Sequence, residues 1–109
     1  MREPKRTRGT GTADGASIDA AFAAEGLVPH RWSNGPGDLY AVHDHAYDKV
    51  LYCLRGSITF TMPAAGVTTD LAPGDRLDLP AGTPHGAIVG PGGVDCMEAA
   101  RPAAEGSDG

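Results

Sequence analysis

The chain has 109 residues, a length that suits one domain with one hydrophobic core. Its net charge is −5, but four of its nine basic residues fall within the first eight positions, and the rest of the chain is strongly acidic. An acidic body argues against nucleic acid as a partner, and no apolar run approaches the ~18 residues that cross a membrane. The charged N-terminus lacks the apolar stretch of a secretory signal, so we expect a cytoplasmic protein.

The first 15 residues are charged and then rich in Gly and Thr, which predicts a disordered tail with solvated basic side chains. A short helix is predicted over 17–24, with Ser17 as its N-cap and Gly26 after its end. From Leu27 onward, strand-forming stretches alternate with Gly and Pro breaks, which predicts an all-β, antiparallel sandwich or barrel over residues 16–100. The predicted strands cover 28–33, 38–45, 49–55, 57–62, 67–70, 75–79, 84–89 and 94–99, and residues 101–109 form a predicted flexible tail.

Two spaced motifs stand in the middle of the chain: Gly37-x5-His43-x-His45-x3-Lys49-x6-Gly56, and Gly74-x5-Pro80-x-Gly82-x2-His85. Side chains alternate along a strand, so His43 and His45 are expected on one face. If the strand resumes in phase, Lys49, Leu51 and Cys53 share that face, while Val50, Tyr52 and Leu54 point away.

In the second motif, Pro80 and Gly82 predict a bend that brings His85 to the same place. Three imidazoles from two segments could bind one divalent transition metal, and they would leave coordination positions open for a ligand. We therefore predict His43, His45 and His85 as metal ligands, with Fe, Mn, Ni, Cu or Zn as the ion.

Both motifs resemble the two conserved motifs of the cupins, G-x5-H-x-H-x3-4-E-x6-G and G-x5-P-x-G-x2-H-x3-N. The resemblance implies a small single-domain cupin of the conserved cupin-2 type, a double-stranded β-helix or jelly-roll barrel with a short N-terminal helix. Two positions depart from the pattern: Lys49 stands where the cupin motif has Glu, and Val89 where it has Asn.

Lys49 leaves three interpretations open, because a protonated ammonium cannot ligate a metal. The metal could bind through the histidines alone; Asp48, Asp78 or Glu98 could hold the lysine away from it; or the pocket could hold no metal. Near the open face, Lys49 is a candidate acid/base group or a group that orients an anionic substrate. It could equally lie at the barrel rim beside Tyr47 and Asp48.

Other residues near the motifs receive more ordinary interpretations. His30 lies outside the motif spacing and is expected at the surface or in the pocket wall. Trp32 is expected in the core or an interface. Tyr40 is expected to point away from the histidines, and Tyr47 to join the pocket wall if no bulge intervenes. The two cysteines are expected to be reduced and buried.

Two functions follow from this pattern. The first is an enzyme, dioxygenase- or isomerase-like, that acts on a small polar or anionic molecule at a three-histidine metal site. The second is a non-catalytic cupin that binds or senses a small molecule, with or without metal; a purely structural role ranks last. In each case we expect a homodimer, because strand edges invite pairing and Val50, Tyr52 and Leu54 offer an apolar face. We expect neither a nucleic-acid nor a membrane partner.

Overall fold

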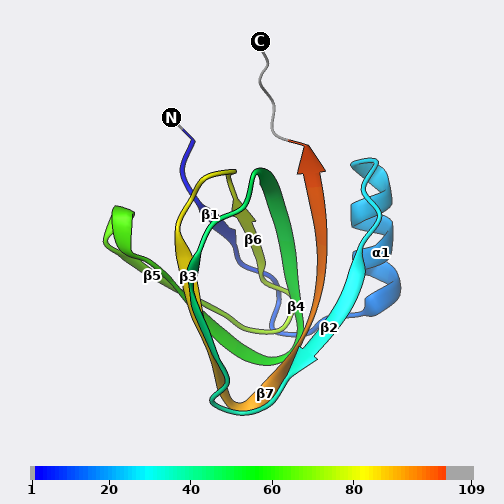
Figure 1. The fold of residues 1–109 in the computed structure, drawn as a ribbon. Helices are drawn as coiled ribbons and strands as arrows, with labels where there is room; N and C mark the ends of the chain where they lie inside the picture. Colours follow the sequence, from blue (N-terminus) through cyan, green and yellow to red (C-terminus); the bar gives the residue numbers. More distant parts are fainter. Residues whose placement is uncertain (1, 103–109) are drawn as a thin grey trace.

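The computed structural model describes residues 2–102, whose strands form one curved antiparallel sheet with a short helix on its outer side (Figure 1). The predicted antiparallel all-β architecture with a short N-terminal helix is confirmed. The elements are β1 (Lys5–Thr7), α1 (Gly15–Ala24), β2 (His30–Asn34), β3 (Leu39–His43), β4 (Tyr47–Met62), the 3-10 turn η1 (Pro63–Ala65), β5 (Val67–Leu71), β6 (Arg76–Leu79) and β7 (His85–Pro102).

Two long strands, β4 and β7, form the centre of the sheet and pair along almost their whole lengths. Each replaces two shorter strands of the prediction. The pairing register shifts on either side of Gly56, which lies inside β4 with a φ of +76°. A Cβ at Gly56 would overlap the carbonyl of Gly93 on β7. Gly56 therefore makes a bulge that bends the strand, where the sequence had predicted a turn that ends it.

Within the predicted antiparallel β architecture, the sheet is open. The order is β1-β6-β4-β7-β2, with β3 added along β7 and β5 added along β4. The short strands thus pair with successive stretches of the two long strands, and the described residues show no pairing that would join the outer strands into a ring. Bending of β4 and β7 still wraps the sheet around an interior (Figure 1).

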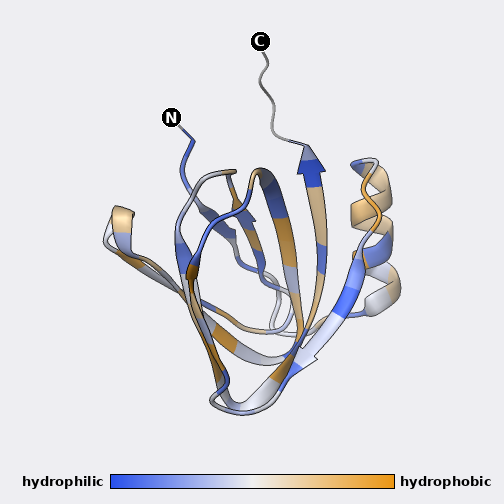
Figure 2. Ribbon diagram, viewed as in Figure 1, coloured by the Kyte–Doolittle hydropathy of each residue, from blue (hydrophilic) through white to orange (hydrophobic). Residues whose placement is uncertain are grey.

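The two faces of β4 bury separate apolar clusters, as the alternation of side chains predicts. The inner cluster includes Leu51, Cys53 and Phe60. On the outer face, Val50 and Leu54 pack against Ile18 and Phe22 of α1. Figure 2 shows hydrophobic stretches along α1 and β4. The apolar face that we expected to support dimerisation is thus covered by the protein's own helix, so that argument for a dimer is wrong and the dimer stays a prediction.

The helix begins earlier than predicted. Asp14, and not Ser17, is the N-cap: its side chain accepts a hydrogen bond from the Ala16 amide and another from the Ser17 hydroxyl at 3.0 Å. Within the described residues, no helix is both long enough and apolar enough to cross a membrane.

The segment 1–15, predicted as a disordered tail, contains strand β1, which pairs with β6. Its three arginines find acidic partners on the body of the protein. Arg8 Nη1 lies 2.6 Å from a carboxylate oxygen of the buried Asp75, and Arg2 pairs with Asp48. The prediction failed because it treated the basic residues as solvated, whereas the acidic body supplies a counter-charge at each of these positions. At the other end, β7 extends to Pro102, and the rest of the predicted C-terminal tail lies outside the described residues.

Candidate metal centre

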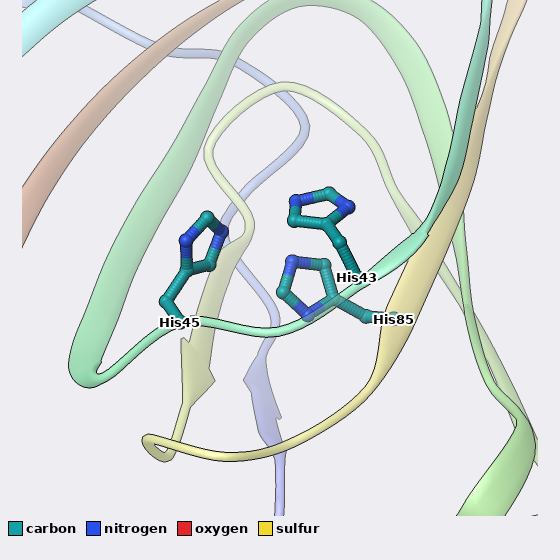
Figure 3. Close-up of side chains that lie close together, drawn as sticks. All are labelled: His43, His45 and His85. Atoms are coloured by element: carbon teal, nitrogen blue, oxygen red, sulfur yellow. The ribbon is translucent and has the colours of Figure 1, made fainter.

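The three motif histidines lie together at one end of the interior, where the end of β3 meets the start of β7 (Figure 3). His43 and His85 are direct partners in the β3·β7 pairing, and their ring centroids lie 4.6 Å apart. His45 follows in the link between β3 and β4, with its ring centroid 4.8 Å from that of His43. One nitrogen from each ring lies within 4.8 Å of the others, so the group could hold a metal ion.

The backbone orients two of these rings. Nδ1 of His43 lies 2.7 Å from the Ala41 carbonyl oxygen, and Nδ1 of His85 lies 2.8 Å from that of Thr83. A carbonyl can only accept, so Nδ1 carries the proton and the lone pair is on Nε2. In metal sites, a hydrogen bond at the far ring nitrogen fixes the tautomer in this way.

The Nε2 atoms of His45 and His85 are buried and have no hydrogen-bond partner among residues 2–102. An unpartnered buried polar atom is costly and calls for an explanation. A metal ion bound between the rings would give both atoms a partner. The donor set therefore fits a divalent transition metal.

A short turn fixes the positions of His45 and His85 relative to each other. Gly82 has a φ of +77° in the turn Pro80–Thr83, which is closed by a hydrogen bond from the Thr83 amide to the Pro80 carbonyl at 3.2 Å. The Gly82 amide donates to the His45 carbonyl at 2.8 Å. The Ala81 amide donates to the buried Asp48 carboxylate at 2.8 Å. The motif's Pro and Gly thus build a turn that connects both histidine-bearing segments.

Electrostatics favour the neutral forms of His45 and His85. Burial lowers the pKa of His85, and the positive charge of Lys49 adds to that effect. Burial also lowers the pKa of His45; Lys49 acts in the same direction, whereas Glu98 opposes it. Neutral imidazole is the form that ligates a metal.

Lys49 lies in the interior and pairs with Glu98. Its Nζ lies 3.6 Å from Glu98 Oε2, and the two side chains are only 11% and 12% exposed. The interpretation at the rim beside Tyr47 and Asp48 is therefore wrong. Of the three carboxylates considered, Glu98 holds the lysine, because Asp48 binds Arg2 and Asp78 binds Arg76.

A cavity of ≈ 220 Å³ opens beside His43 and His85. Trp32, Tyr40 and Phe60 form its apolar wall, and Lys49 and Glu98 supply its two formal charges. The remaining lining residues are Gly86 and Ala87. This volume is below the range of about 300–1,000 Å³ that is typical of small-molecule pockets, so the cavity suits a small ligand.

The prediction that Tyr40 points away is wrong. The β3·β7 register shifts between Tyr40 and His43, so two residues three positions apart both face the interior. This irregularity reverses the expected parity. Tyr40 packs edge-on against Trp32 with ring centroids 5.9 Å apart, and its hydroxyl donates to Asn34.

The other residues considered near the motifs are Tyr47, His30 and the two cysteines. Tyr47 stacks on the His45 ring at 4.8 Å between centroids. His30 is exposed on β2 and does not belong to the histidine cluster. Both cysteines are free and buried, and they face each other across β4 and β7.

No protein-family model and no curated protein matches this sequence. Solved structures of other proteins do match its fold. An RmlC-like cupin from Shewanella frigidimarina is 28% identical over 72% of this chain and 68% of its own, with a TM-score of 0.61. This chain has the fold of a small cupin domain.

Two further structures support the cupin fold. The polyketide cyclase RemF from Streptomyces resistomycificus is 29% identical over 68% of this chain, with a TM-score of 0.59, and this chain covers 54% of RemF. KdgF from a Halomonas species is 21% identical over 89% of this chain and 79% of its own, with a TM-score of 0.58. At that identity, KdgF shows the fold alone.

Proposed function

We propose that this cupin binds one divalent transition metal through Nε2 of His43, His45 and His85. The observation that carries the proposal is the pair of buried, unpartnered Nε2 atoms on His45 and His85. The Nδ1 protons of His43 and His85 are engaged by backbone carbonyls. When bound, such an ion supplies Lewis acidity and open coordination positions.

The cavity beside the metal site is proposed to take a small polar or anionic molecule for a dioxygenase- or isomerase-like reaction. Lys49 directs an ammonium into this space and could orient a carboxylate or enolate, or act as an acid/base group. Trp32 and Phe60 would pack against the apolar part of the molecule and exclude water. Structurally similar cupins include a polyketide cyclase and a DMSP lyase, which supports small-molecule chemistry on this fold.

The test is metal analysis of protein purified and reconstituted without oxygen. We expect about one equivalent of a transition metal in the wild type, and loss of most of it in His43→Ala, His45→Ala and His85→Ala. His30→Ala is the matched control, since this exposed histidine lies outside the cluster. Less than about a tenth of an equivalent in the reconstituted wild type would refute metal binding. Oxygen uptake with a panel of small carboxylic acids would then test turnover.

The second candidate is a non-catalytic cupin that senses a small molecule, and the small apolar cavity favours it equally. A ligand that raises the melting temperature without being consumed would support this function. In that case, the His43→Ala/His85→Ala variant should still bind the ligand. Loss of binding would favour the metal-centred proposal.

A further inference from the structure

The Lys49 side chain creates an electrostatic problem for the proposed metal site. It is nearly buried and lines the same cavity as His43 and His85. A bare ammonium there would repel a divalent cation, and a low-dielectric interior strengthens that repulsion. A metal site that contains this lysine therefore needs a group that compensates the charge of the ammonium.

We propose that Glu98 neutralises Lys49 and thereby keeps the three-histidine site able to bind a divalent cation. This inference rests on the proposed metal-binding function. Glu98 acts here as a positioning and charge-balancing residue, and it does not ligate the metal. Its carboxylate is absent from the cluster of donor atoms that lie within 4.8 Å of one another.

The geometry shows that the Glu98 carboxylate is held in place on both oxygens. Oε2 faces Lys49 Nζ at 3.6 Å, and Oε1 accepts a hydrogen bond from Trp32 Nε1 at 3.0 Å. These partners come from the two strands that flank β7: Lys49 from β4 and Trp32 from β2. In the pairing of β4 with β7, Glu98 lies opposite Leu51, which makes it a diagonal neighbour of Lys49.

The charge balance of the cavity depends on this pair alone. Among the cavity-lining residues, Lys49 is the only cation and Glu98 the only carboxylate. With both present, the lining is neutral; without Glu98, it carries one buried positive charge. Removal of one partner from a buried ion pair leaves the other uncompensated, whereas removal of both relieves the penalty.

The experiment measures Co²⁺ affinity by visible absorbance, with chelator competition, for four proteins: wild type, Glu98→Gln, Lys49→Met and the double variant. We expect Glu98→Gln to weaken Co²⁺ binding by about 10- to 100-fold. Lys49→Met should bind at least as tightly as the wild type, because it removes the repulsive charge. The double variant should return to within about threefold of the wild type.

Asp95→Asn is the matched control, since it removes the same charge from the same strand at a residue that lies outside the cavity and pairs with Arg55. It should leave Co²⁺ affinity unchanged. Thermal unfolding of the metal-free proteins shows whether each variant is folded. If Glu98→Gln does not fold, Lys49→Met and the double variant still decide. Lys49→Met leaves the Glu98 charge unopposed and should bind Co²⁺ more tightly than the double variant, whereas equal affinities would show that the pair does not affect the metal.

Three results overturn the inference. Unchanged affinity in Glu98→Gln would show that the pair does not affect the metal. A double variant as weak as Glu98→Gln would show that Glu98 acts as a ligand or a structural support, and not by neutralising Lys49. Failure of the wild type to bind Co²⁺ would refute the proposed function itself, and the inference with it.

Discussion

Replacement of Asp48 by Ala should both destabilise the protein and disturb the histidine site. Asp48 is 7% exposed, and its carboxylate accepts a hydrogen bond from the Ala81 amide at 2.8 Å and a second from Arg2 Nη2 at 2.9 Å. The Ala side chain would leave the Ala81 amide without this acceptor. A hydrogen bond to a charged group contributes ~2 kcal/mol, which corresponds to a melting temperature about 10 °C lower for a domain of this size.

The effect should be larger than that of removing the arginine. Arg2 is half exposed, so the Asp48 carboxylate that remains in Arg2→Ala can hydrate on that side and still bind the Ala81 amide. We therefore expect a clearly smaller loss of stability in Arg2→Ala, measured by urea unfolding of the metal-free protein. Equal losses in the two variants would refute the claim that Asp48 acts mainly through the turn.

The same variant tests the connection between the turn and the proposed ligands. The Gly82 amide in that turn binds the His45 carbonyl, so release of the turn should displace His45 and weaken Co²⁺ binding. Phe22→Ala is a matched control that destabilises the protein at α1, on the face of the sheet opposite the histidines. If both variants lower Co²⁺ affinity equally, general loss of stability is the cause and the turn has no specific role.

Three further predictions follow from the fold. Phe22→Ala removes a fully buried ring from the α1 interface, so the free energy of unfolding should fall by about 3–5 kcal/mol, and light scattering should detect self-association through the exposed apolar face. Gly56→Ala places a side chain at a residue with positive φ, where its Cβ would overlap the Gly93 carbonyl. Urea unfolding should show a loss of more than about 2 kcal/mol in the free energy of unfolding. Gly92→Ala is the control, because its Cβ would meet open space, and it should lose far less. Hydrogen bonds from Arg76 and Arg101 lower the pKa of Glu25 from 4.5 to about 2; the pKa is depressed in the folded state, so its stabilising contribution is complete above pH 4.5 and is lost as the pH falls toward 2. Urea unfolding across that window should show a flatter profile for Glu25→Gln than for the wild type.

The motif spacing predicted the convergence of the histidines because it encodes backbone geometry. A turn with positive φ at Gly82 and direct pairing of β3 with β7 are enough to bring His43 and His85 together. Strand alternation also predicted the inward face of β4 correctly, since Lys49 lines the cavity and Leu51 lies in the inner core. These features depend on local spacing, which a sequence displays directly.

What the sequence did not reveal depends on irregular register and on contacts between distant segments. The sequence between Tyr40 and His43 contains no Gly or Pro that would indicate the bulge, and because of this bulge Tyr40 lines the cavity. The choice of Glu98 as the partner of Lys49 required the relative register of β4 and β7. The sequence contained one indication of this partner. Glu98 is two residues from Cys96 in a strand, so both side chains point to the same face, and an inward-facing Cys96 places the Glu98 carboxylate in the interior.

Lys49 stands where the cupin motif has a glutamate, and this difference changes the charge that a ligand would meet at the proposed site. Three neutral imidazoles contribute no charge, and the Lys49–Glu98 pair adds none in total. A divalent ion would therefore keep its full charge of +2, whereas a cupin with the glutamate would reduce it to +1. An anionic ligand would gain more from the site with Lys49 than from a site with glutamate. The cavity of ≈ 220 Å³ with aromatic walls suits a small anion. The Lys49–Glu98 pair, which stands where a cupin has a ligating glutamate, would thus favour small anions by leaving the charge of the bound ion uncompensated.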